Sequence, residues 1–385
     1  MVEIASIVLA VSALYYLWFV GNARRGLRLL LAQSRTTAQP QATVIVPARN
    51  EQENLSRCLD ALLAQTYPAE KVQIIISDDG SEDRTAEIVR SYALKNPRIQ
   101  LVQLGMEKNY RPTKKRGRKP EAIACAIEHA AAEIVLTTDA DCETSPTWVA
   151  EMVSYFTPEV GFVSGPVAEL PRPEFFARLR ALEFFGLVLT SAGRIGIQSP
   201  INASGANLAF RRSLYQATGG FDFNAIKSDE ETLMHKVFIR QLGKIAFASA
   251  PGAKVFTRPS RSVRSFWHQR LRWGEMQGRY ERTSLLWELS GIYFAFLLWA
   301  ATVCLSLWMP RAAIPAALFF GMKMVIDYWT LRLGARMLDE RFRILDFLIA
   351  ELLHMPYILI VTAAAQILPS NWKGRKVLKW QILSF

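Results

Sequence analysis

The sequence has few cysteines, and their spacing matches no known cysteine motif. Its four cysteines, Cys58, Cys125, Cys142 and Cys304, stand singly in a chain of 385 residues. This excludes a disulfide-stapled secreted scaffold and any Cys-x-x-Cys zinc or redox motif. Internal repeats and low-complexity tracts are also lacking. With 51% hydrophobic residues and a mean hydropathy of +0.11, the chain is too apolar to be a disordered protein.

The apolar residues are concentrated at the two ends of the chain. Residues 2–20 are mostly apolar and carry no charge except that of Glu3, and this length just suffices for one bilayer crossing of about 20 residues. The positive charges Arg24 and Arg25 follow this stretch instead of preceding it, which favours an uncleaved anchor over a signal peptide. We therefore expect residues 1–22 to be a transmembrane anchor, with the following domain in the cytoplasm by the positive-inside rule.

A second apolar region, residues 285–368, is expected to cross the membrane two or three times. Its central part carries Lys323 and Asp327, which lie one helical turn apart on the same face, where they can pair. Three crossings would place the C-terminus outside, whereas the basic tail over residues 369–385 favours the inside. Residues 263–284, just before this region, form a basic and aromatic-rich amphipathic segment, which is typical of a helix in the membrane interface.

Residues 40–262 have the composition of a globular domain and alternate between strand and helix patterns. This alternation predicts an α/β fold with a mostly parallel sheet covered by helices. Ligands of such sheets bind beyond the carboxyl ends of the strands, so the residues at those ends are the candidates for chemistry. The expected strands are 42–46, 72–77, 99–104 and 133–138, and the expected helices are 51–65, 85–94 and 120–132.

Three polar motifs follow three of these strands. They are Pro47-Ala48-Arg49-Asn50-Glu51, Asp78-Asp79-Gly80-Ser81 and Asp139-Ala140-Asp141. Any one of them alone is explained by turn chemistry. Two carboxylates one residue apart after a buried strand are costly unless a positive group lies between them. Mg²⁺ or Mn²⁺ with a bound diphosphate is the natural partner, because these ions take carboxylate and phosphate oxygens.

Two further segments are candidates for a site. The tract from Lys108 to Lys119 is strongly basic and is either a solvated loop or a place for a diphosphate or anionic lipid headgroups. Nucleic acid is not expected as a partner, because aromatic residues are almost lacking there. Ser228-Asp229-Glu230-Glu231 precedes an apolar helical run and is either a helix cap or the source of a proton-accepting carboxylate. Residues 204–207 are a candidate lining of an acceptor pocket.

Together with Gln269-x-x-Arg272-Trp273, these motifs resemble the ordered motif set of family 2 glycosyltransferases. The similarity is to the membrane-anchored inverting members with a GT-A fold, and it covers roughly residues 40–280. It implies transfer of a sugar from a nucleotide-sugar, commonly UDP-linked, to an acceptor hydroxyl, without a covalent enzyme intermediate. The alternative outside the enzymes is a non-catalytic membrane scaffold with a degenerate transferase domain.

The resemblance also implies roles for single residues on the donor side. Asp141, helped by Asp139, would hold Mn²⁺ or Mg²⁺ on the donor diphosphate, and Lys119 would meet the donor phosphates or sugar. Residues that would contact the nucleobase and ribose are Pro47, Arg49, Asn50, Glu51 and Asp79. Residues that would cap the donor and order the leaving diphosphate are Gln269, Arg272 and Trp273.

The catalytic base departs from the family pattern. The family usually has a Glu-Asp pair whose Asp is the base, whereas this chain has Asp229-Glu230-Glu231. Alignment on Leu233 places Glu230 at the position of the base and leaves Asp229 as the alternative. One additional methylene in Glu230 does not prohibit this role.

The acceptor is expected to be associated with the membrane, and a lipid is the favoured class. The expected spans and the interfacial features over residues 263–284 support it, as does the segment 173–197, which is either a core helix or a monotopic helix beside an acceptor tunnel. The alternative is a processive polysaccharide synthase of the cellulose or hyaluronan synthase type, because the Gln-x-x-Arg-Trp motif also occurs there. We expect an integral protein of the bacterial inner membrane with its catalytic domain in the cytoplasm.

Overall fold

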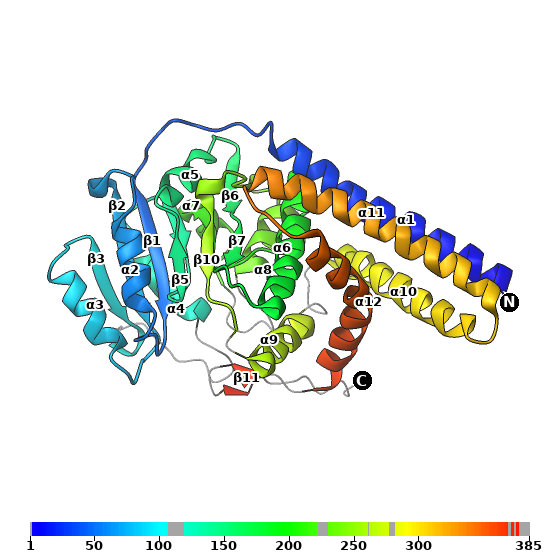
Figure 1. Cartoon of the computed structure of the whole chain (residues 1–385). Coiled ribbons are helices and arrows are strands. Elements are labelled where there is room, and N and C mark those ends of the chain that lie inside the picture. Colours follow the sequence, from blue (N-terminus) through cyan, green and yellow to red (C-terminus); the bar gives the residue numbers. More distant parts are fainter. Residues whose placement is uncertain are drawn as a thin grey trace, which may run out of the picture. The chain divides into compact units, whose positions relative to one another are not determined.

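The structure is a computed structural model that describes residues 2–106, 119–221, 230–260, 262–276, 282–368, 371–372 and 375–376. The chain forms two compact units, each built from segments that are far apart in the sequence (Figure 1). The first, here called the sheet unit, contains Arg28–Leu170 and Arg194–Pro259. The second, here called the helical unit, contains Met1–Leu27, Pro171–Gly193 and Ser260–Phe385.

The sheet unit contains a seven-stranded sheet in the order β3-β2-β1-β4-β8-β6-β9. Neighbouring strands pair in parallel except at β8, which is antiparallel to both β4 and β6. The predicted α/β class with a mostly parallel sheet is therefore confirmed. The strands are β1 (Ala42–Ala48), β2 (Val72–Asp78), β3 (Ile99–Gln103), β4 (Ile134–Thr137), β6 (Val160–Ser164), β8 (Leu208–Arg211) and β9 (Lys244–Phe247).

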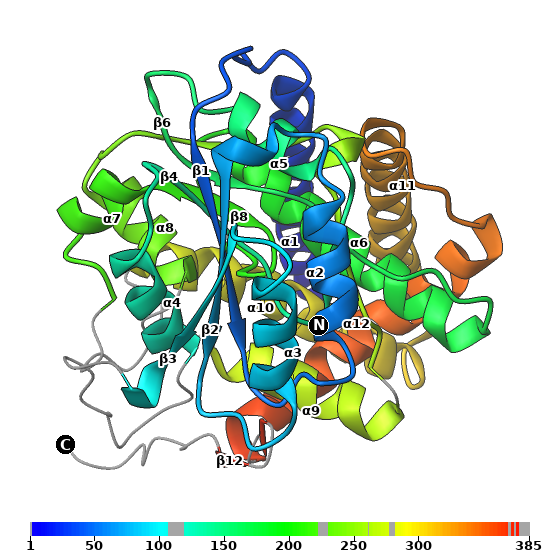
Figure 2. The ribbon, with the colours of Figure 1, turned by 90° about the vertical axis from the view of Figure 1, so that its left-hand side faces the viewer.

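Helices cover this sheet, and a small second sheet accompanies it. Helix α4 packs on β1 and β2 while α3 packs against β3, and Figure 2 shows α4 on one side of these strands and α2 and α3 on the other. The second sheet has the order β5-β10-β7. Its strands are β5 (Cys142–Thr144), β10 (Val255–Thr257) and β7 (Val167–Glu169). The helices of the unit are α2 (Leu55–Leu63), α3 (Thr85–Ala93), α4 (Lys119–Glu128), α5 (Trp148–Ser154), α7 (Arg212–Ala217) and α8 (Glu230–Ile239).

The first helix of the sheet unit begins four residues later than the sequence pattern predicts. Apolar spacing suggests a helix from Glu51, but α2 begins at Leu55. Residues 51–54 form a turn instead, in which the Asn54 N–H donates to the Glu51 carbonyl at 2.9 Å. The backbone N–H groups of Glu51 and Gln52 donate to the side chains of Thr85, the first residue of α3, at 2.8 Å and of Asp83 in the loop before it at 3.1 Å. These residues tie two loops together at the end of the sheet, and the helix starts only after them.

The helical unit is built from long helices. Within the described residues, four of them are long and apolar enough to cross a membrane, namely α1, α10, α11 and α12. Three of these candidates, α10, α11 and α12, follow the sheet unit in the sequence. Two or three membrane crossings are expected in this region. The helices are α1 (Val2–Leu30), α6 (Phe175–Gly196), α9 (Val263–Met276), α10 (Thr283–Ser306), α11 (Ala313–Met337) and α12 (Ile344–Ile367), and a short hairpin follows with β11 (Asn371–Trp372) and β12 (Arg375–Lys376).

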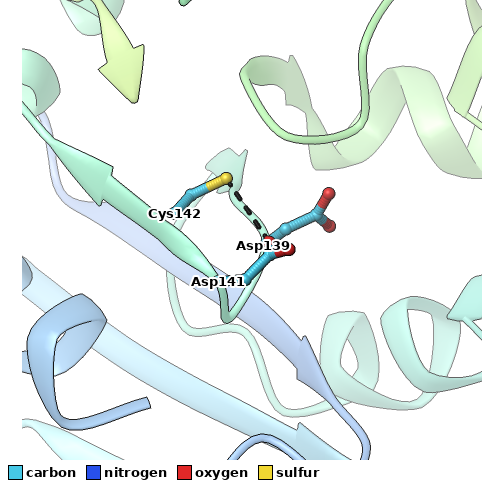
Figure 3. Close-up of side chains that lie close together, drawn as sticks. All are labelled: Asp139, Asp141 and Cys142. Atoms are coloured by element: carbon cyan, nitrogen blue, oxygen red, sulfur yellow. Dashed lines mark hydrogen bonds between the residues drawn. The ribbon is translucent and has the colours of Figure 1, made fainter. Parts of the chain in front are cut away.

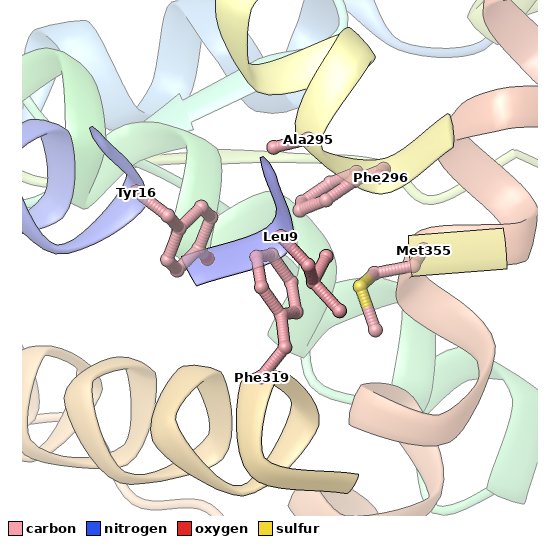
Figure 4. Close-up of a cluster of buried hydrophobic side chains, with 6 residues drawn as sticks. All are labelled: Leu9, Tyr16, Ala295, Phe296, Phe319 and Met355. Atoms are coloured by element: carbon pink, nitrogen blue, oxygen red, sulfur yellow. The ribbon is translucent and has the colours of Figure 1, made fainter. Parts of the chain in front are cut away.

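An apolar cluster joins the first helix to the three C-terminal ones. Figure 1 shows α1 and α11 running side by side, and Figure 4 shows the side chains that meet between them and their neighbours. Burial of such side chains against one another excludes lipid and water and gains packing contacts. The cluster consists of Leu9 and Tyr16 from α1, Ala295 and Phe296 from α10, Phe319 from α11 and Met355 from α12.

A group of ionisable side chains lies beside this cluster. Lys323 of α11 is completely buried, and its ammonium lies 2.7 Å from the carboxylate of Asp327 and also contacts Glu351 of α12. The hydroxyl of Tyr16 in α1 donates a hydrogen bond to Asp327 at 2.7 Å. The predicted pairing of Lys323 with Asp327 is confirmed, and two further helices contribute to it. Buried charges of this kind require such partners.

Helices α1 and α6 approach each other with backbone against backbone. A Cβ atom added at Gly26 would lie 1.7 Å from the carbonyl oxygen of Gly193, and one added at Gly193 would lie 2.0 Å from the carbonyl oxygen of Ala23. Glycine is therefore required at both positions, because any side chain would force the helices apart. Small residues allow such close helix crossings in membranes.

We predict that Gly26→Ala destabilises the helical unit by about 1–3 kcal/mol, because overpacking at a backbone contact forces the helices to shift. The matched control is Gly21→Ala in the same helix, where an added Cβ meets nothing within 4 Å. Thermal unfolding of the purified protein in detergent should show a lower midpoint only for the Gly26 variant. Equal midpoints for the two variants would contradict the close contact.

We also predict that Lys323→Met lowers stability by about 3–5 kcal/mol, because it leaves the buried Glu351 and the half-buried Asp327 without their cation. The control combines Lys323→Met with Asp327→Asn and Glu351→Gln, which removes the charges together and should recover most of the loss. Unfolding by denaturing detergent measures both variants. If the single variant unfolds at the same detergent fraction as the unaltered protein, the ion cluster does not hold these helices together.

Candidate functional site

The three polar motifs lie at the carboxyl ends of neighbouring parallel strands. Strand β1 pairs with β2 so that Ala48 is opposite Asp78, and it pairs with β4 so that Ile45 is opposite Thr137. The loops that follow these strands therefore leave the sheet at the same edge. Pro47 lies inside β1 opposite Ser77, and the other predicted residues of the first two motifs lie in or beside the loops.

Arg49 and Asp79 connect the first two loops. The guanidinium Nη1 of Arg49 donates to the carbonyl oxygen of Asp79 at 2.8 Å and lies 3.5 Å from its carboxylate. The backbone N–H of Asp79 donates in turn to the carbonyl of Ala48 at 2.9 Å. Asp79 is buried and Arg49 is half-buried. A carboxylate held in this way is a fixed acceptor, and Arg49 compensates its charge.

Asn50 and Glu51 hold the same loops from the other side. Asn50 has a positive φ of 52°, which asparagine tolerates better than most residues. The side-chain oxygen of Asn50 accepts a hydrogen bond from the backbone N–H of Glu82, and the backbone N–H of Asn50 donates to the hydroxyl of Ser81, both at 2.9 Å. The Glu51 carboxylate accepts a hydrogen bond from Asn54 at 2.8 Å and is buried. These contacts brace the loops, and a role in nucleotide binding stays a prediction.

Asp139 and Asp141 lie after β4 with Cys142 next to them (Figure 3). One ligand atom from each of the three residues lies within 4.8 Å of the others, and the Cys142 sulfur is 3.7 Å from Asp141 Oδ1. Burial raises the pKa of the Cys142 thiol, and the charges of Asp139 and Asp141 raise it further, so the thiol stays neutral. The charged ligands are two carboxylates. This donor set fits a hard divalent cation such as Mg²⁺ or Mn²⁺.

Lys119 connects this pair to a third carboxylate. It is the first residue of α4, and its ammonium lies 2.7 Å from Asp139 Oδ1 and 3.2 Å from Glu230 Oε1 at the start of α8. Burial by itself lowers the pKa of Lys119, but Asp139 and Glu230 outweigh it and hold the pKa well above its ordinary value. Lys119 is therefore charged at neutral pH. The structure thus brings together three residues that the sequence names separately.

Gly205, one of the residues expected to line an acceptor pocket, belongs to this arrangement. A Cβ atom at this position would lie 2.2 Å from Glu230 Oε1 and 2.7 Å from the Lys119 nitrogen. The Thr137 hydroxyl donates to the Gly205 carbonyl at 3.1 Å and fixes it against β4. The missing side chain therefore makes the room in which Glu230 and Lys119 meet. A glycine just before a buried strand is the available sequence signal for such a close approach.

Asn207, grouped with Gly205 as a candidate lining of an acceptor pocket, has a structural role instead. It is fully buried, and its amide nitrogen donates to the carbonyls of Pro166 at 2.7 Å and Ala253 at 2.8 Å. Its side-chain oxygen accepts from the Trp148 indole at 2.8 Å. Expecting Asn207 in an acceptor pocket is therefore wrong, because its amide is already used inside the protein.

The Gln-x-x-Arg-Trp residues belong to α9 in the helical unit. The Gln269 side-chain oxygen accepts from the Ser260 hydroxyl at 3.1 Å, and Arg272 is half-buried. The guanidinium of Arg270 lies over the ring of Trp273, 4.2 Å from its centroid, and the centroid of the Phe184 ring lies 5.8 Å from that of Trp273. Their predicted contacts with a donor stay predictions, because the other candidate residues belong to the sheet unit.

Arg270 stands at a position that the Gln-x-x-Arg-Trp motif leaves open, and sequence reasoning gave it no role. It is buried, forms an ion pair with Glu183 of α6 and lies over the rings of Phe266 and Trp273. It therefore holds α9 against α6 and orients the tryptophan of the motif. Two predicted elements, Asp229 and the basic tract before Lys119, lie outside the described residues.

The chain is similar to known proteins over about three quarters of its length. Poly-beta-1,6-N-acetyl-D-glucosamine synthase of Staphylococcus epidermidis is 25% identical over 72% of this chain and 63% of its own length. Beta-monoglucosyldiacylglycerol synthase of Synechocystis sp. is 24% identical over 74% of this chain and 58% of its own length. The chain thus spans less than two thirds of the length of these two relatives.

A solved structure has the same fold along nearly the whole chain. The mannosyltransferase PcManGT from Pyrobaculum calidifontis, in complex with GDP-Man and Mn²⁺, superimposes with a TM-score of 0.58 at 21% identity and covers 93% of this chain and 99% of its own. The expected GT-A fold is thereby confirmed. The family model described as Glycosyl transferase family 2 matches residues 43–218, and the one described as Glycosyl transferase family group 2 matches residues 134–338, more than half of the chain. The chain therefore belongs to the family 2 glycosyltransferases.

Proposed function

We propose that this chain is an inverting, metal-dependent transferase that moves a sugar from a nucleotide-sugar to a lipid acceptor at the membrane. The observation that carries the proposal is the shared position of Asp139, Lys119 and Glu230. A donor-side carboxylate and a buried carboxylate from another segment contact the same ammonium. A transferase of this kind needs a site for the donor diphosphate and a base for the acceptor hydroxyl next to each other.

The donor would bind at the ends of β1, β2 and β4. Arg49 and Asp79 offer a fixed cation and carboxylate to the nucleoside, while Asp141 and Asp139 would hold Mn²⁺ or Mg²⁺. The ion supplies charge neutralisation for the leaving diphosphate. We favour a UDP-linked donor from the family resemblance. The solved mannosyltransferase was bound to GDP-Man and Mn²⁺, which supports a divalent ion and makes a GDP-linked donor the competing choice.

Glu230 would take the proton from the acceptor hydroxyl. The freed oxygen then forms a bond to the anomeric carbon on the face opposite the diphosphate, and the bond between that carbon and the phosphate oxygen breaks. Lys119 keeps positive charge beside the carboxylates during this step, and Gln269, Arg272 and Trp273 are proposed to cap the donor. A buried carboxylate with a fixed orientation is suited to general-base catalysis.

The proposed acceptor is a membrane lipid. Four helices of the described chain are long and apolar enough to cross a bilayer, and one relative is named as a synthase of a glucosylated diacylglycerol. We propose an integral protein of the bacterial inner membrane with the sheet unit in the cytoplasm, since Arg24 and Arg25 follow the apolar part of α1. The second candidate is a processive polysaccharide synthase, favoured by the poly-N-acetylglucosamine synthase among the relatives.

We expect the purified protein to transfer a radiolabelled sugar into the organic phase when it is incubated with Mn²⁺, bacterial lipid extract and, in separate reactions, UDP-glucose, UDP-N-acetylglucosamine or GDP-mannose. Asp141→Asn should reduce transfer by at least about 100-fold, because it weakens the cation site. The exposed Asp339→Asn in the helical unit is the control and should remain active. Label found only in a water-soluble polymer would favour the synthase, and no transfer from any donor would contradict the proposal.

We further predict that Gly205→Ala lowers kcat by about 10- to 100-fold, because the new methyl group displaces the Glu230 carboxylate from its position. The donor KM should change less than kcat, since the methyl group lies closer to Glu230 Oε1, at 2.2 Å, than to the Lys119 nitrogen, at 2.7 Å, and the loops that carry Arg49 and Asp79 are untouched. Gly105→Ala is the matched control, because an added Cβ there meets nothing within 4 Å. Steady-state kinetics separate the two parameters, and an unchanged kcat in the Gly205 variant would show that this position does not orient the base.

A further inference from the structure

Lys119 stands between two carboxylates with different proposed tasks. Its ammonium lies 2.7 Å from Asp139, which belongs to the proposed cation site, and 3.2 Å from Glu230, the proposed base. The side chains of Lys119 and Asp139 are only partly exposed, at 27% and 34%, and that of Glu230 is 7% exposed. One monovalent cation thus satisfies a carboxylate that would otherwise be available to a divalent ion.

We infer that Lys119 competes with the divalent cation for Asp139 and thereby makes cation binding depend on the nucleotide. This inference rests on the proposed function. An ammonium at hydrogen-bond distance from Asp139 occupies one lone pair of the carboxylate and repels any second cation that approaches it. Asp141 alone then offers a weaker site, because affinity for hard cations falls with the number of charged oxygen ligands.

The nucleotide changes this balance through its diphosphate. The phosphates carry negative charge to the same edge of the sheet and offer Lys119 another partner, as the family resemblance also implies. Lys119 can then leave Asp139 to the divalent ion while remaining near Glu230. The arrangement keeps the base paired with a cation whether or not the donor is present.

Competition of this kind has a thermodynamic consequence. If the nucleotide raises the affinity for the cation, the cation must raise the affinity for the nucleotide by the same factor. Lys119 contributes to that factor because it weakens cation binding only in the absence of nucleotide. Removing its charge should therefore strengthen binding of the cation alone and reduce the cooperativity between the two ligands.

The experiment measures binding and not turnover. Mn²⁺ is titrated into the full-length protein and free Mn²⁺ is followed by electron paramagnetic resonance, without nucleotide and with saturating UDP or GDP. Lys119→Met and Lys119→Gln remove the charge, and Lys119→Arg keeps it. Lys71→Met controls for the loss of one positive charge. Lys71 immediately precedes β2, at the end of the strand that is remote from the candidate site, and its ammonium donates to the Gln39 carbonyl.

We expect both neutral variants to bind Mn²⁺ without nucleotide roughly tenfold more tightly than the unaltered protein, within the usual range of coupling between sites. The enhancement by nucleotide should shrink by the same factor, while Lys119→Arg and Lys71→Met should behave like the unaltered protein. Size-exclusion profiles establish that each variant is folded, and the two neutral substitutions serve as independent checks on each other.

Three results would overturn the inference in distinguishable ways. If Asp141→Asn abolishes Mn²⁺ binding but the neutral Lys119 variants bind Mn²⁺ no more tightly than the unaltered protein, the competition is refuted while the proposed cation site stands. If Mn²⁺ binding is unaffected by Asp141→Asn, both the competition and the proposed cation site are refuted. Weaker binding in the neutral variants would assign Lys119 a role in supporting the cation.

Discussion

The parallel pairing of β2, β1 and β4 is the constraint on which the candidate site depends. Parallel strands end at the same edge, so the acidic residues that follow them, Asp79 and Asp139, are brought to one side of the sheet. Carboxylates gathered in this way repel one another unless cations compensate them. Arg49 compensates the first and Lys119 the second, and Lys119 also reaches Glu230. The chemistry proposed here follows from this need for cations.

Most of the sheet could be predicted from the sequence, because periodicity and strand-end motifs are local signals. The starts of β1 and β2 coincide with the predicted residues, whereas α2 begins only after a turn over residues 51–54, which side chains of a loop far along the sequence hold in place. The site was harder to predict. Which partner Lys119 meets, and why residue 205 must be glycine, depends on segments that lie far apart in the sequence. The structural role of Asn207 was missed for the same reason.

The helical unit shows the same limit. An i, i+4 rule suffices to pair Lys323 with Asp327, but it does not show that Glu351 and Tyr16 complete the group from other helices. Likewise, hydropathy identifies apolar helices without showing which of them touch. The backbone contact of Gly26 with Gly193 joins α1 to α6, which begins about 145 residues after the end of α1. A single glycine in a sequence does not show which helix it contacts.

The departure of this chain from the family pattern at the base is best understood together with Gly205. A glutamate at position 230 carries one more methylene than the aspartate usual in the family, so its carboxylate extends further from α8. The absence of a Cβ at Gly205 leaves room for that extension, since a methyl group there would lie 2.2 Å from Glu230 Oε1. Lys119 then meets the carboxylate at 3.2 Å. A longer side chain at the proposed base and a smaller neighbour are thus complementary, and a change at either position alone would disturb the pairing with Lys119 and Asp139.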